Sequence, residues 1–77
     1  MAANTKNFRE IYQGLPVEMQ GSIKAELIYQ LRINQSTFWR WTKGHYPTLF
    51  LTRKAATQII NELLGTQHTP ETLFPMN

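Results

Sequence analysis

The side chains best suited to chemistry gather in one short stretch, residues 35–43. They are Gln35, Ser36, Thr37, Trp39, Arg40 and Lys43. A glutamine amide can pair with adenine, an arginine guanidinium with guanine, a hydroxyl with either base, and an aromatic ring can cover a thymine methyl group. On one exposed face, these side chains predict a surface that contacts base edges in double-stranded DNA.

The positive charge of the chain is concentrated around this stretch. The interval between Glu26 and Glu62 holds five of the eight basic residues and none of the five acidic ones, within a net charge of +3. Its basic residues are Arg32, Arg40, Lys43, Arg53 and Lys54. A cationic segment attracts polyanions through counterion release. Charge alone also fits an anionic membrane surface or a solvated basic face.

The remaining polar residues do not form a pattern typical of an enzyme. The chain has no cysteine, no aspartate and no glycine-rich phosphate loop. His45 and His68 are too far apart in the sequence to indicate a metal site. Glu26 and Glu62 fall in expected helices, where solvated charge is a simpler interpretation than a carboxylate pair. We expect no catalysis, metal, cofactor or small-molecule substrate.

Helical spacing of apolar residues predicts an all-α fold, with 77 residues in a single domain. A first helix is expected over residues 5–13, ending at Gly14, with Phe8, Ile11 and Tyr12 on its inner face. Pro16 suits the start of the next helix and Ser22 is a second candidate N-cap, so residues 16–31 form one helix or two.

Two central helices are separated by only Arg32, Ile33 and Asn34. The first carries an apolar stripe of Ile23, Leu27, Ile28 and Leu31. The second, residues 35–43, has Asn34 as its N-cap, Gly44 as its end, and Phe38 and Trp41 on its inner face. So short a connection predicts a steep crossing, which is typical of a helix-turn-helix.

Two further helices are expected after Pro47. Thr48 or Thr52 would cap a long helix that ends at Gly65. Its apolar residues are Leu51, Ala55, Ile59, Ile60, Leu63 and Leu64. Thr69 and Pro70 would begin a last turn that docks Leu73 and Phe74 on the body of the protein.

The stretch IKAELIYQLRINQSTFWRWTKG, residues 23–44, resembles the helix-turn-helix of phage repressor and Cro-like regulators. The shared hallmark is a tryptophan two residues before a basic residue and a glycine, here Trp41, Lys43 and Gly44. Glu26 and Leu27 match the Glu-Leu pair of the first motif helix. The resemblance implies a compact lambda-repressor-like domain of four to five helices.

The resemblance also implies which residues contact DNA. The base contacts would come from Gln35, Ser36 and Arg40, with Thr37 and Trp39 at the groove edge. The backbone contacts would come from Lys24, Asn34, Lys43, His45, Tyr46 and Arg53. Two residues depart from the family pattern: Arg32 replaces a glycine that often needs φ above zero, at a cost of roughly 1 kcal/mol, and Ile28 replaces a small alanine, which predicts a wider crossing.

These observations predict a sequence-specific, cytoplasmic transcription regulator that binds DNA as a homodimer. The N-terminal segment, residues 1–10, lacks the apolar stretch of a secretory signal, and no apolar run is long enough to cross a membrane. The alternative is a helical protein-interaction module with Trp39, Tyr46 and Phe50 as an aromatic patch. A core position for Trp39, beside Trp41, is a further interpretation.

Overall fold

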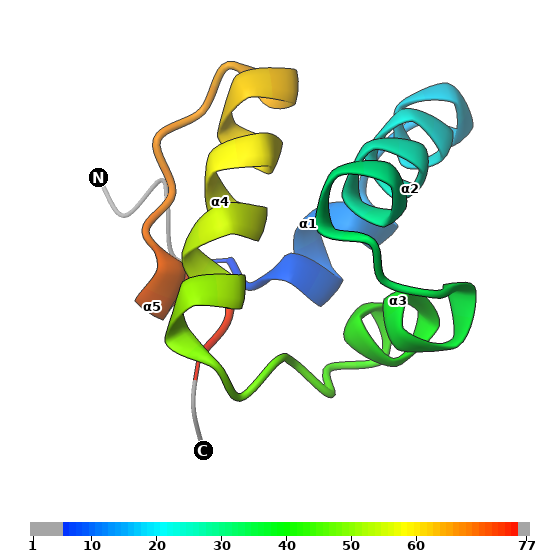
Figure 1. Ribbon diagram of the computed structural model, residues 1–77. Coiled ribbons are helices and arrows are strands. Elements are labelled where there is room, and N and C mark those ends of the chain that lie inside the picture. Colours follow the sequence, from blue (N-terminus) through cyan, green and yellow to red (C-terminus); the bar gives the residue numbers. More distant parts are fainter. Residues whose placement is uncertain (1–5, 76–77) are drawn as a thin grey trace.

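The computed structural model describes residues 6–75, which form five helices and no strand (Figure 1). The helices are α1 (Phe8–Gln13), α2 (Val17–Leu31), α3 (Gln35–Thr42), α4 (Phe50–Leu64) and α5 (Pro70–Leu73). The Cα radius of gyration is 11.3 Å. The all-helical prediction is confirmed over these residues. None of the described helices has the length and apolarity that a membrane crossing requires.

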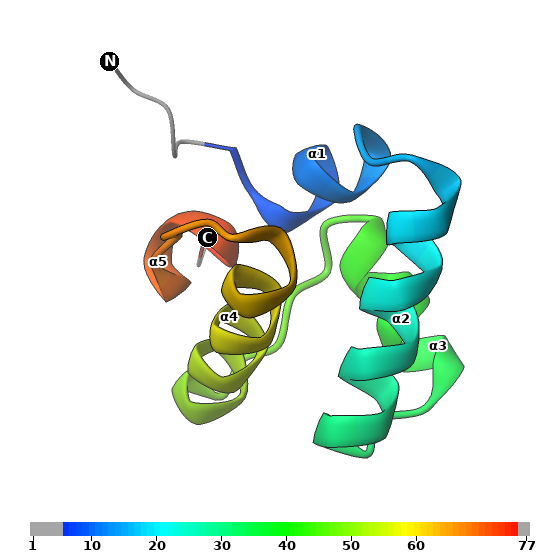
Figure 2. The same cartoon turned by 90° about the horizontal axis from the view of Figure 1, so that it is seen from above.

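The helices form two groups with α1 between them. Figure 2 shows α2 and α3 on one side and α4 and α5 on the other, and α1 lies across the end where the groups meet. The packing joins α2 to α4, α1 to α3, α4 to α5 and α2 to α3. Helices α2 and α3 are therefore held by packing against both α1 and α4.

Helix α1 begins later than the sequence predicts. Asn7 and Glu10 form a capping box, in which the Asn7 side chain accepts from the Glu10 N–H at 3.0 Å and Glu10 Oε1 accepts from the Asn7 N–H at 3.1 Å. A reciprocal cap satisfies free N–H groups at the helix start, so the helix begins at Phe8. The prediction of a start at Thr5 is wrong for Lys6 and Asn7, and Thr5 itself lies outside the described residues.

Helix α2 is one continuous helix through Gly21 and Ser22. Pro16 occupies its N-cap position without a side-chain cap, and Ser22 lies in the interior. Ile23 and Leu27 are buried, while Ile28 and Leu31 are partly buried against the core. The predicted apolar stripe is confirmed, and the question of one helix or two is settled in favour of one.

The start of α4 differs from the prediction. Leu49 is its N-cap residue and no side chain caps it, so neither Thr48 nor Thr52 performs that role. Leu51 is 77% exposed, so the prediction that it faces the core is wrong. The buried residues of α4 are Ala56, Thr57, Ile59 and Ile60. At the other end, Gly65 takes φ 66°, and the predicted helix end is confirmed.

The core is centred on aromatic rings from both ends of the chain. Phe74 is fully buried, and its ring lies 5.5 Å from Phe8, 5.7 Å from Trp41 and 5.5 Å from Tyr46, centroid to centroid. Burying such a ring contributes about 1.5–3 kcal/mol. The predicted docking of Leu73 and Phe74 is confirmed, as is the Thr69 cap of α5.

Candidate nucleic-acid interface

The turn between α2 and α3 sets the position of the candidate recognition helix. Arg32 ends α2 in the left-handed region, with φ 56° and ψ 37°. The Asn34 side chain then accepts from the Thr37 N–H at 2.8 Å and caps α3. The Asn34 cap confirms the prediction from the sequence. Arg32 was expected to disfavour a positive φ, and the turn takes that conformation despite the side chain. The positive φ and the Asn34 cap together turn the chain sharply enough for α3 to pack against α2 after three residues.

The inner face of α3 is fixed by two aromatic residues. Phe38 is 0% and Trp41 is 3% exposed. Phe38 makes edge contacts with Phe8 and Tyr12 of α1, and Trp41 makes one with Phe74. Because one side of α3 is committed to the core, its remaining residues have a defined outward direction. Helix α3 ends at Thr42, one residue before the predicted end, with Gly44 at φ 94° just beyond.

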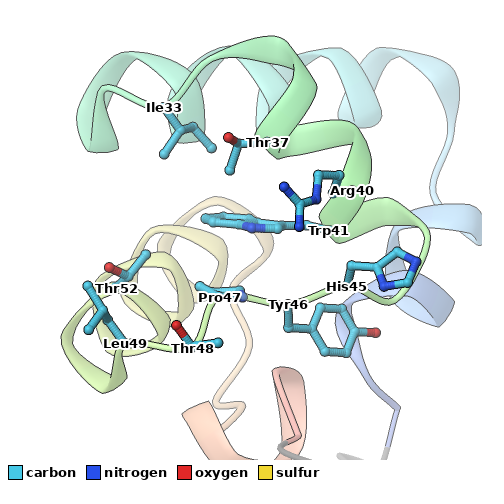
Figure 3. Close-up of a pocket in the computed structure, with 10 residues that line it drawn as sticks. All are labelled: Ile33, Thr37, Arg40, Trp41, His45, Tyr46, Pro47, Thr48, Leu49 and Thr52. Carbon is cyan, nitrogen blue, oxygen red and sulfur yellow. The ribbon is translucent and has the colours of Figure 1, made fainter.

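Most of the predicted base-contacting residues lie on the exposed face of α3. Gln35, Ser36, Trp39 and Arg40 are exposed, whereas Thr37 is half-buried. The Thr37 side chain points toward α4 (Figure 3), and its N–H is already bonded to Asn34. The structure therefore brings four of the five residues together on one surface.

Trp39 is on the surface and has a cationic neighbour. Its side chain is 41% exposed, so the interpretation that placed it in the core with Trp41 is wrong. The Lys24 ammonium group lies 4.8 Å from the Trp39 ring centroid, and the Phe38 ring makes an edge contact with Trp39 at a centroid distance of 5.4 Å. A cation–π contact at an exposed site contributes about 0.5–1 kcal/mol. Lys24, predicted to contact phosphate, thus lies beside the exposed face of α3.

Arg40 borders a hollow between α3 and α4. This α3–α4 hollow has a volume of about 300 Å³ and is lined by α3, the loop that follows it and the first turn of α4. Figure 3 shows the Arg40 side chain and the Trp41 indole reaching into the space between these elements. Arg40 is exposed, so its guanidinium has access both to the outer surface and to the hollow.

The residues after α3 that are predicted to contact the DNA backbone differ in their exposure. Lys43 and His45 are exposed, and the His45 N–H is bonded to the Arg40 carbonyl at 2.9 Å. Tyr46 is half-buried, and its hydroxyl accepts from the Arg9 N–H at 3.2 Å. Burial raises the pKa of Tyr46, so its phenol stays protonated and its O–H can donate a hydrogen bond.

Arg53 makes a contact within the protein that the sequence did not indicate. Its Nη1 donates to the Phe74 carbonyl at 3.4 Å, and its guanidinium carbon lies 5.5 Å from the Phe50 ring centroid. Its Nε is buried without a partner in the described structure. Arg53 therefore links α4 to the end of α5, and no local sequence signal marks such a pairing.

Comparison with protein-family models, curated proteins and solved structures finds no match to this chain. Among residues 6–75, no group of three or more histidine or acidic side chains is placed to hold a metal ion. The surface of α3, with its basic and amide side chains, is the most distinctive polar feature that the motif helices present.

Proposed function

We propose that the chain binds double-stranded DNA in a sequence-specific way and regulates transcription, within a lambda-repressor-like arrangement of its helices. The observation that supports this most directly is the two-sided character of α3. Phe38 and Trp41 hold one side in the core, and the exposed side carries Gln35, Ser36 and Arg40. A short three-residue turn and an asparagine cap place this helix at the protein surface.

The dimensions of α3 suit the major groove. An α-helix with its side chains is about 10–12 Å in diameter, and the major groove of B-DNA is about 12 Å wide. In helix-turn-helix proteins the N-terminal residues of the second helix reach the base edges. Gln35 and Ser36 occupy these positions here, and Arg40 lies further along α3.

The charge around α3 supports a polyanionic partner. Lys24 and Lys43 flank the helix, and the sequence between Glu26 and Glu62 has no acidic residue to repel phosphate. Contacts to phosphate position a protein on DNA, whereas contacts to bases select the site. We propose a homodimer, because one recognition helix covers only a short half-site and paired half-sites increase affinity and specificity.

Substitutions at Arg40 separate base recognition from charge. The preferred site is first selected from a randomised duplex pool, and affinity is then measured on that site and on a scrambled duplex. Arg40→Ala should abolish the preference between the two duplexes. Arg40→Lys keeps the charge but loses the two-pronged guanidinium, so it should retain affinity for the scrambled duplex and still lose most of the preference.

Lys43→Ala provides the comparison for a phosphate contact. It should weaken binding to both duplexes by the same factor. It should also reduce the slope of log K against log salt by about one, the contribution of one phosphate contact. If Arg40→Ala and Lys43→Ala reduced binding to both duplexes equally, the contacts would be electrostatic only and the proposal of sequence-specific binding would fail.

A second candidate function follows from an exposed apolar run at the start of α4. Leu49, Phe50 and Leu51 are 70%, 47% and 77% exposed. Such a run suits contact with a protein partner. It therefore supports the alternative function, that of a helical protein-interaction module. The three aromatic residues of that alternative have separate neighbours: Trp39 lies by Phe38 and Lys24, Tyr46 by Phe74, and Phe50 by Arg53. Binding to an apolar partner should change little with salt.

A further inference from the structure

The α3–α4 hollow has the size of a small-ligand site. Its volume of about 300 Å³ is at the lower end of the range for ligand pockets, about 300–1,000 Å³. A water molecule takes roughly 30 Å³ in the liquid, so the space corresponds to about ten such volumes. A single-ring compound fits, and a larger one would protrude.

The inner wall of the hollow is apolar and aromatic. Ile33 lies on the α3 side and Pro47 and Leu49 lie on the opposite side, and the Trp41 indole, only 3% exposed, closes the bottom between them (Figure 3). Trp41 is held in place by the core, because its other contacts include the buried Phe74 ring. A rigid wall of this kind favours a flat apolar group over a hydrated ion.

The rim of the hollow carries hydrogen-bond donors and positive charge. Arg40 and His45 contribute basic side chains, and Thr37, Thr48 and Thr52 contribute hydroxyl groups. No acidic residue is among the lining residues. A guanidinium and several hydroxyls around the hollow favour a carboxylate, which a guanidinium can bind through two parallel hydrogen bonds.

The first turn of α4 adds to this preference. Leu49, its N-cap residue, has no side-chain oxygen, and no side chain caps the helix. The first N–H groups of this 15-residue helix carry partial positive charge, and Leu49 and Thr52 of this turn line the hollow. The helix start thus reinforces a preference that the rim side chains already establish.

We infer that the α3–α4 hollow binds a small aromatic carboxylate of about the size of benzoate, with its ring on the apolar wall of the hollow and its carboxylate at Arg40. This goes beyond the proposed DNA binding. One consequence rests on the proposed function: a bound carboxylate holds Arg40, so ligand and DNA compete for the same side chain. By linkage, each weakens the binding of the other by the same factor.

Titration with benzoate in the absence of DNA tests the site itself. Amide and indole N–H chemical shifts are followed by NMR at constant ionic strength. The expected result is saturable shifts at the Trp41 indole, Thr48 and Thr52. Benzamide, which has the same shape without the charge, should bind about three- to tenfold more weakly, the range for a partly exposed ion pair with added hydrogen bonds.

Two variants locate the charge that holds the carboxylate. Arg40→Gln should weaken benzoate binding by the same factor of about three to ten. Lys54→Gln removes an equal charge from an exposed residue that does not line the hollow, so it should leave benzoate binding unchanged. Inorganic phosphate at the same concentration should not reproduce the shifts.

The outcomes separate this inference from the proposed function. Absence of saturable shifts, equal binding of benzamide, or equal shifts with phosphate would overturn the carboxylate site whether or not the chain binds DNA. If benzoate binds, exchanging chloride for benzoate at constant ionic strength should raise the Kd of the protein for a random-sequence duplex. Benzoate binding without an effect on DNA affinity would overturn the competition, and benzoate binding by a chain that does not bind DNA would overturn only the proposed function.

Discussion

Replacing Arg32 by glycine should stabilise the protein. Arg32 is the only non-glycine residue with positive φ in the described part of the chain, with φ 56° and ψ 37° at the end of α2. In the left-handed region, Cβ of an L-residue approaches the following carbonyl oxygen, which costs roughly 1–2 kcal/mol. Glycine has no Cβ and avoids this cost.

Two smaller effects oppose the gain. Glycine makes the unfolded chain more flexible, which costs about 0.4–1 kcal/mol of stability. Arg32 also places a positive charge at the C-terminus of α2, a favourable contact that contributes about 0.3 kcal/mol or more and is weakened by salt. At the middle of these ranges, the expected net effect of Arg32→Gly is a stabilisation of about 0.5 kcal/mol, or an increase in Tm of about 2–4 °C for a domain of this size.

Thermal and urea denaturation, followed by far-ultraviolet circular dichroism at moderate salt, measures this difference. Ala25→Gly is the matched control, because it introduces glycine at an exposed residue in the interior of α2. There the same glycine should destabilise by about 0.5–1 kcal/mol. If Arg32→Gly were destabilising to the same extent as Ala25→Gly, the backbone strain assigned to Arg32 would be refuted.

Three further substitutions test other local features. Gly21→Ala should stabilise by about 0.5–1 kcal/mol, because a Cβ at this position in α2 meets nothing within 4 Å; a lower urea midpoint would contradict the continuous helix. Asn34→Ala should cost about 1 kcal/mol by removing the cap on the Thr37 N–H, whereas Asn34→Asp should retain most of it; equal losses in urea denaturation would exclude the cap as the cause. Burial lowers the pKa of His68 below its usual 6.5, so the unfolded chain takes up the proton first and stability falls as pH drops through and below that value. Stability measured against pH should fall less steeply for His68→Gln, and parallel profiles would contradict this.

The ends of α3 and α4 were predictable because their signals are local. The Asn34 cap, the stop at Gly44 and the end of α4 at Gly65 each depend on the conformation of a few neighbouring residues. The spacing of Phe38 and Trp41 likewise identified the buried side of α3. Knowing that side was enough to predict the exposed surface opposite.

The errors arose where packing between distant segments decides the structure. The predicted apolar face of α4 runs from Leu51 to Leu64, and only the packing of α4 against α2 and α5 decides which part of that face is buried. The contacts of Arg53 with Phe74 and of Tyr46 with Arg9 join residues 21 and 37 positions apart. No local signal specifies such pairs. The same limit applies to the α3–α4 hollow, which exists only once α3 and α4 are placed.

The most direct test of the central proposal is titration of the protein with random-sequence duplex DNA at low and at high salt. The exposed Trp39 on α3 provides the fluorescence signal. We predict binding at low salt that weakens steeply as salt rises, with a slope of about −0.9 in log K against log salt for each phosphate neutralised. With Lys24 and Lys43 on phosphates, the slope would be about −2 per protomer. Absence of binding at low salt would contradict DNA binding by α3 and favour the protein-interaction alternative.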